Sequence, residues 1–239
     1  MNNVILWYNM FGDFMKRPII GVIARPYITD NNRQVLCILE NVRRNILRFG
    51  GIPLLILPTQ DMIYINNKES ELTLEDKEIL DTQIDMCDGI LMPGGDRIYH
   101  YDNYICKRVN EKNMPLLGIC MGMQVMCNYN NSNRNIKVEG HKKPDDEYVH
   151  NVNISKSSKL FNIINQEEIK VNSLHGYMVP NSGEYSISAK CDNVIEGIEK
   201  KDELFNIGVQ WHPERSDDEP STKLINSFVN ACKIYSKLK

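Results

Sequence analysis

The segment that most constrains the fold is a strand that has to turn at once into a helix. Apolar residues 115–117 lead into Gly118-Ile119-Cys120-Met121-Gly122. Such a turn crowds the backbone, so a Cβ two residues before or after the cysteine would clash, and glycine fits both places. The segment has the form of a nucleophile elbow, in which the side chain at the turn is strained and exposed. At a helix N-terminus, Cys120 would also face unpaired N–H groups that favour a thiolate. We interpret Cys120 as a candidate nucleophile; the alternative is a small buried hydrophobic residue.

A second segment supplies a candidate base. The apolar strand pattern of residues 205–211 runs into His212, and Pro213 then fixes φ and removes a donor, so strand pairing should stop there. His212 and Glu214 are two residues apart, which places both side chains on one face of an extended segment. A carboxylate beside an imidazole holds its tautomer and stabilises the imidazolium that forms when it accepts a thiol proton. Alone, His-Pro-Glu is typical of a surface turn, but together with Cys120 it predicts a Cys-His-Glu triad.

These motifs, in this order, resemble the class I glutamine amidotransferase-like superfamily. Within it, the chain is similar to the gamma-glutamyl-gamma-aminobutyrate hydrolase-like family of gamma-glutamyl amide hydrolases. The likeness spans residues 18–236. It is carried by Pro18-Ile19-Ile20-Gly21, Phe49-Gly50-Gly51-Ile52-Pro53 with Leu57-Pro58, Asp88-Gly89-Ile90-Leu91-Met92-Pro93-Gly94-Gly95-Asp96, Gly118-Ile119-Cys120-Met121-Gly122-Met123-Gln124, Val171-Asn172-Ser173-Leu174-His175 and Gly208-Val209-Gln210-Trp211-His212-Pro213-Glu214.

Strand and helix patterns alternate after residue 18, which predicts an α/β fold with a mostly parallel central sheet covered by helices on both faces. The resemblance implies a flavodoxin-like three-layer sandwich. We expect Gly50 to cap the first helix. The expected strands are 19–23, 52–57, 89–92, 116–119, 149–154, 185–188, 194–199 and 205–210, and the expected helices are 33–49, 74–86, 103–113, one from residue 121, and 222–237.

Composition excludes several classes of protein. A net charge of −3 gives no field suited to nucleic acid. The sequence contains no run of eighteen apolar residues, so we expect no membrane span. Seven cysteines without regular spacing or a secretion signal indicate a reducing, cytoplasmic location and not a disulfide framework. We expect no metal and no cofactor, because the histidines are scattered and no Cys-x-x-Cys pair is present. Homodimerisation is left open.

Residues 1–17 match nothing in the family pattern. They mix apolar residues with Asn and Asp and lack the basic start and the small-residue cleavage site of a signal peptide. We therefore expect residues 1–17 to be a dispensable N-terminal extension and residues 18–239 to form a single catalytic domain.

The remaining candidate site residues follow the same strand ends. Backbone N–H groups of Gly95 and Met121, with Gly94 as an alternative to Gly95, are the expected oxyanion donors, because a glycine loop allows close approach and the residue after a nucleophile points its N–H into the site. Gln124 lies one helical turn after the nucleophile, and the resemblance implies that it holds the glutamyl moiety; the alternative is a structural glutamine that caps a loop. The resemblance also suggests that Ser173 and His175 contact the glutamyl group, against a buried structural role for the histidine.

These residues predict a cysteine-dependent hydrolase of γ-glutamyl amides that acts through a thioester and releases glutamate and an amine. One alternative is a glutaminase subunit that passes ammonia to a separate synthase; another is a non-catalytic binding protein on the same fold. After the elbow helix, residues 128–135 lack the double glycine that is usual in the family, and the loop is shortened. The leaving amine is therefore open among γ-aminobutyrate and polyamine-derived, peptide-like or amino-sugar amines.

Overall fold

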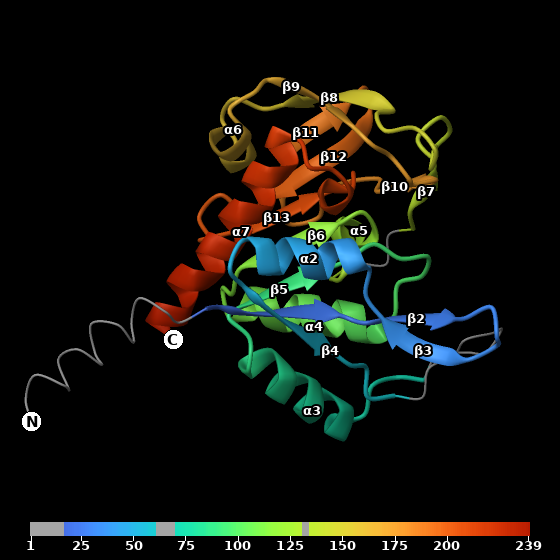
Figure 1. Ribbon diagram of the computed structural model, residues 1–239, viewed down its shortest axis with the longest axis vertical. Coiled ribbons are helices and arrows are strands. Elements are labelled where there is room, and N and C mark those ends of the chain that lie inside the picture. Colours follow the sequence, from blue (N-terminus) through green and yellow to red (C-terminus); the bar gives the residue numbers. More distant parts are fainter. Residues whose placement is uncertain (1–16, 61–69, 131–133) are drawn as a thin grey trace, which may run out of the picture.

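The structure, a computed structural model, describes residues 17–60, 70–130 and 134–239 (Figure 1). The predicted N-terminal extension, apart from Arg17, lies outside the described residues, as do three positions of the loop after the elbow helix. No helix among the described residues is long and apolar enough to cross a membrane.

The predicted α/β fold is confirmed. In the described part of the chain the main sheet has nine strands, of which the first five in sheet order run parallel and the rest antiparallel. In that order they are β4 (Ile52–Ile56), β1 (Ile19–Ile23), β5 (Gly89–Met92), β6 (Leu116–Ile119), β13 (Asn206–Val209), β12 (Val194–Glu199), β11 (Ser186–Cys191), β8 (His150–Ile154) and β9 (Glu168–Val171). Strands β5, β6 and β13 are buried along their whole length, which explains why each reads as a nearly unbroken apolar run.

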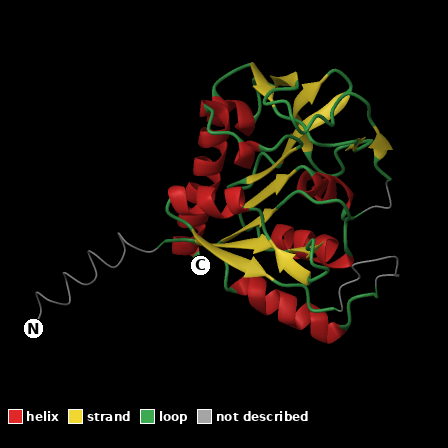
Figure 2. Cartoon of the chain, turned by 45° about the vertical axis from the view of Figure 1, so that its right-hand side comes forward, coloured by secondary structure: helices red, strands yellow, loops and turns green. Residues whose placement is uncertain are grey.

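Helices cover both faces of this sheet (Figures 1 and 2). The described α-helices form two groups of three, one on each face. The first group packs around a core that includes Ile46, Leu160 and Phe228, and the second packs around a core that includes Leu80 and Ile105. The first group is α2 (Glu40–Arg48), α6 (Lys159–Ile164) and α7 (Glu219–Leu238), and the second is α3 (Leu74–Asp85), α4 (His100–Glu111) and α5 (Met121–Asn128). The result is the expected three-layer arrangement.

The helix predicted over 33–49 is wrong in its first part. Residues 25–37 form a hairpin of β2 (Arg25–Ile28) and β3 (Gln34–Cys37), and α2 begins only at Glu40. Asn32 takes a positive φ of 54° in the turn, a conformation that Asn tolerates well, and the antiparallel partner strand supplies hydrogen bonds that a helix would otherwise make. Gly50, the expected cap of this helix, lies one residue after the observed C-cap, Phe49. Gly50 has φ 87°, and the N–H groups of Gly50 and Gly51 donate to the carbonyls of Leu47 and Ile46, as in a Schellman motif.

Short elements in the second half of the chain were missed. They are α6, β9 and a small antiparallel pair of β7 (Ile136–Lys137) and β10 (Tyr177–Met178). Helix α4 begins three residues before its expected start, and α7 begins at Glu219, where the Asp218 side chain accepts a hydrogen bond from Ser221 N–H and caps the helix. These differences leave the parallel half of the sheet, which positions the site, as predicted.

Candidate active site

Three neighbouring parallel strands end at one edge of the sheet, where ligands gather in open α/β folds. Strand β5 leads into Pro93-Gly94-Gly95, β6 into Cys120, and β13 into the segment that carries His212. The strands lie in register, with Met92 beside Gly118 and Ile119 beside Val209. Segments far apart in the sequence therefore meet at this edge.

Cys120 lies in a strained turn between β6 and α5. Its φ is 54° and its ψ −109°, an unusual conformation for a residue with a side chain, and its N–H donates to the Val209 carbonyl at 2.8 Å. A Cβ at Gly122 would lie 2.0 Å from the Met92 carbonyl oxygen, and a Cβ at Gly118 would lie 2.9 Å from the Gly122 backbone. Both glycines thus stand where the backbone leaves no room for a side chain, as the sequence predicts.

His212 and Glu214 form a buried pair at the end of β13. The Nδ1 atom of His212 lies 2.7 Å from Glu214 Oε1, and both residues are at most 5% exposed. Burial opposes protonation of the imidazole, but the Glu214 carboxylate and then the Cys120 thiol outweigh it and raise the pKa of His212 to about 10. Cys120 interacts with the imidazole, although Nε2 forms no well-aligned hydrogen bond with a described residue. This is a common state for a catalytic pair before substrate binds.

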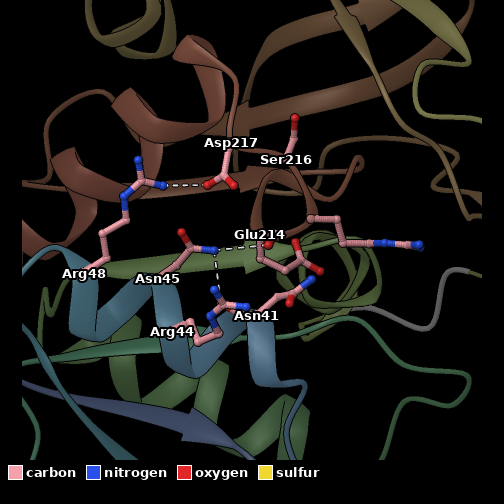
Figure 3. Close-up of a pocket in the computed structure, with 8 residues that line it drawn as sticks. Asn41, Arg44, Asn45, Arg48, Glu214, Ser216 and Asp217 are labelled. Carbon is pink, nitrogen blue, oxygen red and sulfur yellow. Dashed lines mark hydrogen bonds and ion pairs between the residues drawn. The ribbon is translucent and has the colours of Figure 1, made fainter.

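The backbone on both sides of His212 is held in place. Asn172 clamps it at two points, because its Nδ2 donates to the His212 carbonyl and its Oδ1 accepts from the His212 N–H, each at 2.9 Å. On the other side, helix α2 supports the segment after the histidine (Figure 3). Asn45 Nδ2 donates to the Glu214 carbonyl at 3.1 Å, and Arg48 pairs with Asp217 at 2.6 Å. The imidazole therefore has little freedom to turn away from Cys120.

Cys120 and His212 open into a cavity of about 320 Å³. The glycine loop forms one wall. An added Cβ at Gly94 would lie 3.0 Å from His212 Cε1 and 3.6 Å from Cys120 Cβ, so this glycine lies directly against the pair. The other wall residues are Arg25, Pro26, Tyr27, Cys37, Ile38, Leu39, Pro93, Gly95, Asp96, Arg97, Tyr99 and Leu174.

Several of these wall residues could not be identified from the sequence motifs. Arg25 comes from the unexpected hairpin; its guanidinium donates to the Pro93 carbonyl at 2.9 Å and pairs with the buried Asp102 at 2.6 Å, which fixes the glycine loop from behind. Asp96 and Arg97 place opposite charges on the cavity wall. The one available signal for Arg25 was its place two residues after a parallel strand, where site residues collect.

Gln124 is placed differently from the cavity residues. Its side-chain amide donates to the Tyr177 carbonyl at 3.0 Å and to Gln210 Oε1 at 3.1 Å, and its oxygen accepts from Asn135 at 2.8 Å. It does not line the cavity described above. Its glutamyl-binding role stays a prediction, and its contacts are those of the structural alternative.

Ser173 and His175 also do not line this cavity. Ser173 is fully buried, and His175 packs against His141 at 3.3 Å between ring nitrogens. Leu174, between them, does line the cavity. The predicted contacts of Ser173 and His175 with substrate stay predictions.

Comparisons with known proteins identify relatives of this chain. A family model described as Peptidase C26 matches residues 96–214, which include Cys120, His212 and Glu214. A Schizosaccharomyces pombe protein with a glutamine amidotransferase name is 34% identical over 183 residues, 63% of this chain and 72% of its own length. The chain belongs to the class I glutamine amidotransferase-like superfamily. It is thus related to hydrolase-type glutaminase domains.

Other relatives differ in how much of their own length this chain covers. A Rickettsia prowazekii glutamine amidotransferase-like protein is 27% identical, with 91% of this chain and 99% of that one covered. The GMP synthase of Dictyostelium discoideum is 35% identical over 153 residues, but only 20% of its length is covered. Among solved structures, a Thermoplasma acidophilum protein described as a GMP synthase subunit superposes with a TM-score of 0.66 at 17% identity, covering 93% of this chain and 98% of that one. At that identity the likeness shows the fold alone.

Proposed function

We propose that this protein hydrolyses γ-glutamyl amides through a γ-glutamyl thioester on Cys120. The observation that carries the proposal is a strained cysteine at a helix N-terminus that lines the same cavity as His212 of the buried His212–Glu214 pair. Nucleophile, base and orienting carboxylate are then each assigned to one residue, as acyl transfer requires.

The reaction follows from these positions. His212 takes the thiol proton, and the Cys120 sulfur attacks the γ-carbonyl carbon of the substrate to give a tetrahedral oxyanion. The imidazolium then gives its proton to the leaving nitrogen, the C–N bond breaks, and an amine leaves. His212 next accepts a proton from water, whose oxygen attacks the thioester carbon. Collapse releases glutamate and returns the proton to the Cys120 sulfur.

Backbone donors are available for the oxyanion. Met121 begins α5 directly after Cys120, and an added Cβ at Gly94 would lie 3.6 Å from Cys120 Cβ. We assign the oxyanion to the N–H groups of Met121 and of Gly95 or Gly94. One such hydrogen bond contributes roughly 3 kcal/mol to lowering the barrier. Asp96 and Arg97 on the cavity wall are the groups that we assign to the α-amino and α-carboxylate ends of a glutamyl substrate.

A second function has a specific observation in its favour. The matches include GMP synthase and CTP synthase, whose names describe enzymes that the chain covers only in part, 20% and 38% of their lengths. A glutaminase subunit that delivers ammonia to a separate synthase would use the same triad. The two functions differ in the leaving group, because the subunit needs glutamine and a hydrolase of substituted amides prefers a larger amine.

The test is glutamate release from a panel of γ-glutamyl amides that includes glutamine, γ-glutamyl-γ-aminobutyrate, γ-glutamyl polyamines and γ-glutamyl peptides. Wild-type protein is compared with Cys120→Ala and with Cys191→Ala, a matched change at a half-buried cysteine on β11, away from the cavity. We expect turnover in wild type and Cys191→Ala and its loss in Cys120→Ala.

A preference for a substituted amide over glutamine supports the hydrolase and names its amine. Activity with glutamine alone that rises when a synthase is added supports the subunit. Full turnover by Cys120→Ala would overturn the nucleophile assignment, and the absence of turnover with every substrate and partner would favour a binding protein.

A further inference from the structure

Four side chains outside the active site converge on one point inside the protein. They are called the histidine cluster here and consist of His141, His150, His175 and Glu196. One nitrogen or oxygen from each lies within 4.8 Å of all the others. The residues come from the loop after β7, the start of β8, the segment before β10 and the middle of β12, so folding alone brings them together.

The distances within the histidine cluster are long for hydrogen bonds between charged groups. Glu196 Oε1 lies 3.3 Å from His141 Nδ1 and 3.5 Å from the Nε2 atoms of both His150 and His175. His141 Nδ1 lies 3.3 Å from His175 Nε2. Charge-assisted N–H···O bonds are shorter, about 2.7–2.9 Å. Around a tetrahedral Zn²⁺ with bonds of about 2.0–2.1 Å, by contrast, neighbouring ligand atoms lie about 3.3–3.4 Å apart. These four distances are close to the edges of such a tetrahedron, and all four ligand atoms lie within 4.8 Å of one another.

Glu196 gives an independent reason to expect a ligand. Its side chain is fully buried, yet neither carboxylate oxygen makes a well-aligned hydrogen bond with a described residue. His150 Nε2 is likewise buried without a hydrogen-bond partner among the described residues. Its nearest polar neighbours are the three histidine nitrogens at 3.3–3.5 Å. A buried carboxylate is costly unless it is well hydrogen-bonded, closely paired or bound to a metal.

A hydrogen bond outside the cluster fixes the tautomer of His175. Its Nδ1 lies 3.1 Å from the Tyr177 carbonyl, which can only accept, so Nδ1 carries the hydrogen. The Nε2 atom of a neutral His175 then presents a lone pair to the cluster. A ligand histidine in a metal site is usually oriented in this way by a carbonyl or carboxylate behind it.

We propose that the histidine cluster binds one Zn²⁺ ion through three imidazole nitrogens and one carboxylate oxygen. Nitrogen-rich donor sets suit zinc and its first-row neighbours and do not suit Mg²⁺ or Ca²⁺. Four protein ligands complete a tetrahedral shell, so the site is closed and structural, without an open position for a substrate. This proposal departs from the expectation of no metal, which rested on the scattered positions of the histidines along the sequence.

Metal binding here would brace the active site from outside. Asn172 clamps the backbone of His212, and His175 follows three residues later on the same segment. Anchoring His175 to β8 and β12 through an ion limits the movement of the segment that carries the clamp. The proposal does not depend on the reaction that the active site performs.

The test measures zinc binding in the full chain after treatment with a chelator. All variants are made in a Cys120→Ala background, so that the Cys120–His212 pair does not contribute a site. The ligand variants are His150→Gln and Glu196→Gln, which keep the size of the side chain, and the matched control is His100→Gln on α4, remote from the cluster. Metal content gives the stoichiometry, and Co²⁺ substitution gives the coordination number from its visible absorption.

We expect about one Zn²⁺ per chain and a four-coordinate Co²⁺ spectrum in the Cys120→Ala background and in the His100→Gln control. Each ligand variant should bind at least about tenfold more weakly and lose that spectrum. Added zinc should raise the melting temperature of the Cys120→Ala background and of the His100→Gln control, but not that of the ligand variants. Circular dichroism checks that the variants are folded. If one of the two ligand variants does not fold, the zinc affinity of the other ligand variant is the test. Equal zinc affinity in ligand variants and control, or no four-coordinate site in the Cys120→Ala background, would overturn the proposal.

Discussion

An alanine at Gly122 should distort the elbow, because the carbonyl end of β5 leaves no room for a side chain there. The added Cβ would lie 2.0 Å from the Met92 carbonyl oxygen and 2.8 Å from its carbon. Carbon–oxygen contacts normally begin at about 3.3 Å, so the helix start or the strand end has to move by about 1.3 Å. Both neighbours are backbone within the core, so no flexible side chain can absorb the displacement.

Two opposing effects set the magnitude of this change. Alanine gains about 1 kcal/mol over glycine in helix propensity, whereas overpacking of a core costs about 1–3 kcal/mol and more where backbone has to shift. The clash should win, with a net loss of about 2 kcal/mol and a fall of about 4–8 °C in melting temperature for a chain of this size. Because Cys120 precedes the displaced turn by two residues, glutamate release should fall by about a hundredfold.

The control for this change is Gly176→Ala. An added Cβ there meets only Lys142 Cδ, at 4.0 Å, and the backbone does not have a positive φ. Its melting temperature should stay within about 2 °C of wild type. Thermal unfolding followed by circular dichroism, together with urea unfolding, measures both variants. If Gly122→Ala melted as high as wild type, the proposed close packing of α5 against β5 would be wrong.

Three further predictions concern buried charges. Glu214→Gln should lower the pKa of His212 from about 10, because the carboxylate is lost, and should reduce turnover by about a hundredfold or more. NMR titration measures the pKa, and initial rates measure the turnover. An unchanged rate would leave Glu214 a structural role only. Because the folded pKa of His212 is raised above its ordinary value of about 6.5, its contribution to stability is fully present below pH 6.5 and is lost as the pH rises through about 10. Urea unfolding between those pH values should therefore show a steeper loss in wild type than in Glu214→Gln, and parallel curves would contradict the assignment. Arg25→Met should lower the free energy of unfolding, measured with urea, by about 3–5 kcal/mol, because it leaves the fully buried Asp102 carboxylate without its ion pair. Adding Asp102→Asn to this variant should recover part of that loss. No recovery would argue against the pair.

The parallel half of the fold could be predicted because its strands are buried on both faces and flanked by clear helix signals. Strands 89–92 and 116–119 were predicted with the bounds that the structure gives them. The pattern of Val35, Leu39, Val42, Ile46 and Phe49 misled for a physical reason. Only its later part faces a core as a helix, whereas Val35 lies in β3, which pairs with β2. Pairing partners are not visible in a local periodicity.

The geometry at the centre of the candidate site could be predicted because it is set by two short motifs. Gly118 and Gly122 lie within two residues of Cys120, and Glu214 within two of His212, so each motif carries its own geometry. The cavity wall is different. Arg25 begins the hairpin strand β2, and Asp96 and Arg97 lie in the loop between β5 and α4. The two-point clamp by Asn172 joins positions forty residues apart.

The segment 172–175 shows how an extended backbone can divide one motif between two sites. Side chains alternate in direction along extended backbone, so Asn172 and Leu174 belong to one side and Ser173 and His175 to the other. Asn172 holds His212 and Leu174 lines its cavity, whereas Ser173 is buried and His175 joins the histidine cluster. The resemblance implies substrate contacts for Ser173 and His175, whereas the residue of this segment that lines the described cavity is Leu174. Replacement of His175 should therefore act on zinc binding and on the position of the Asn172 clamp, and reach the chemistry at Cys120 only through His212.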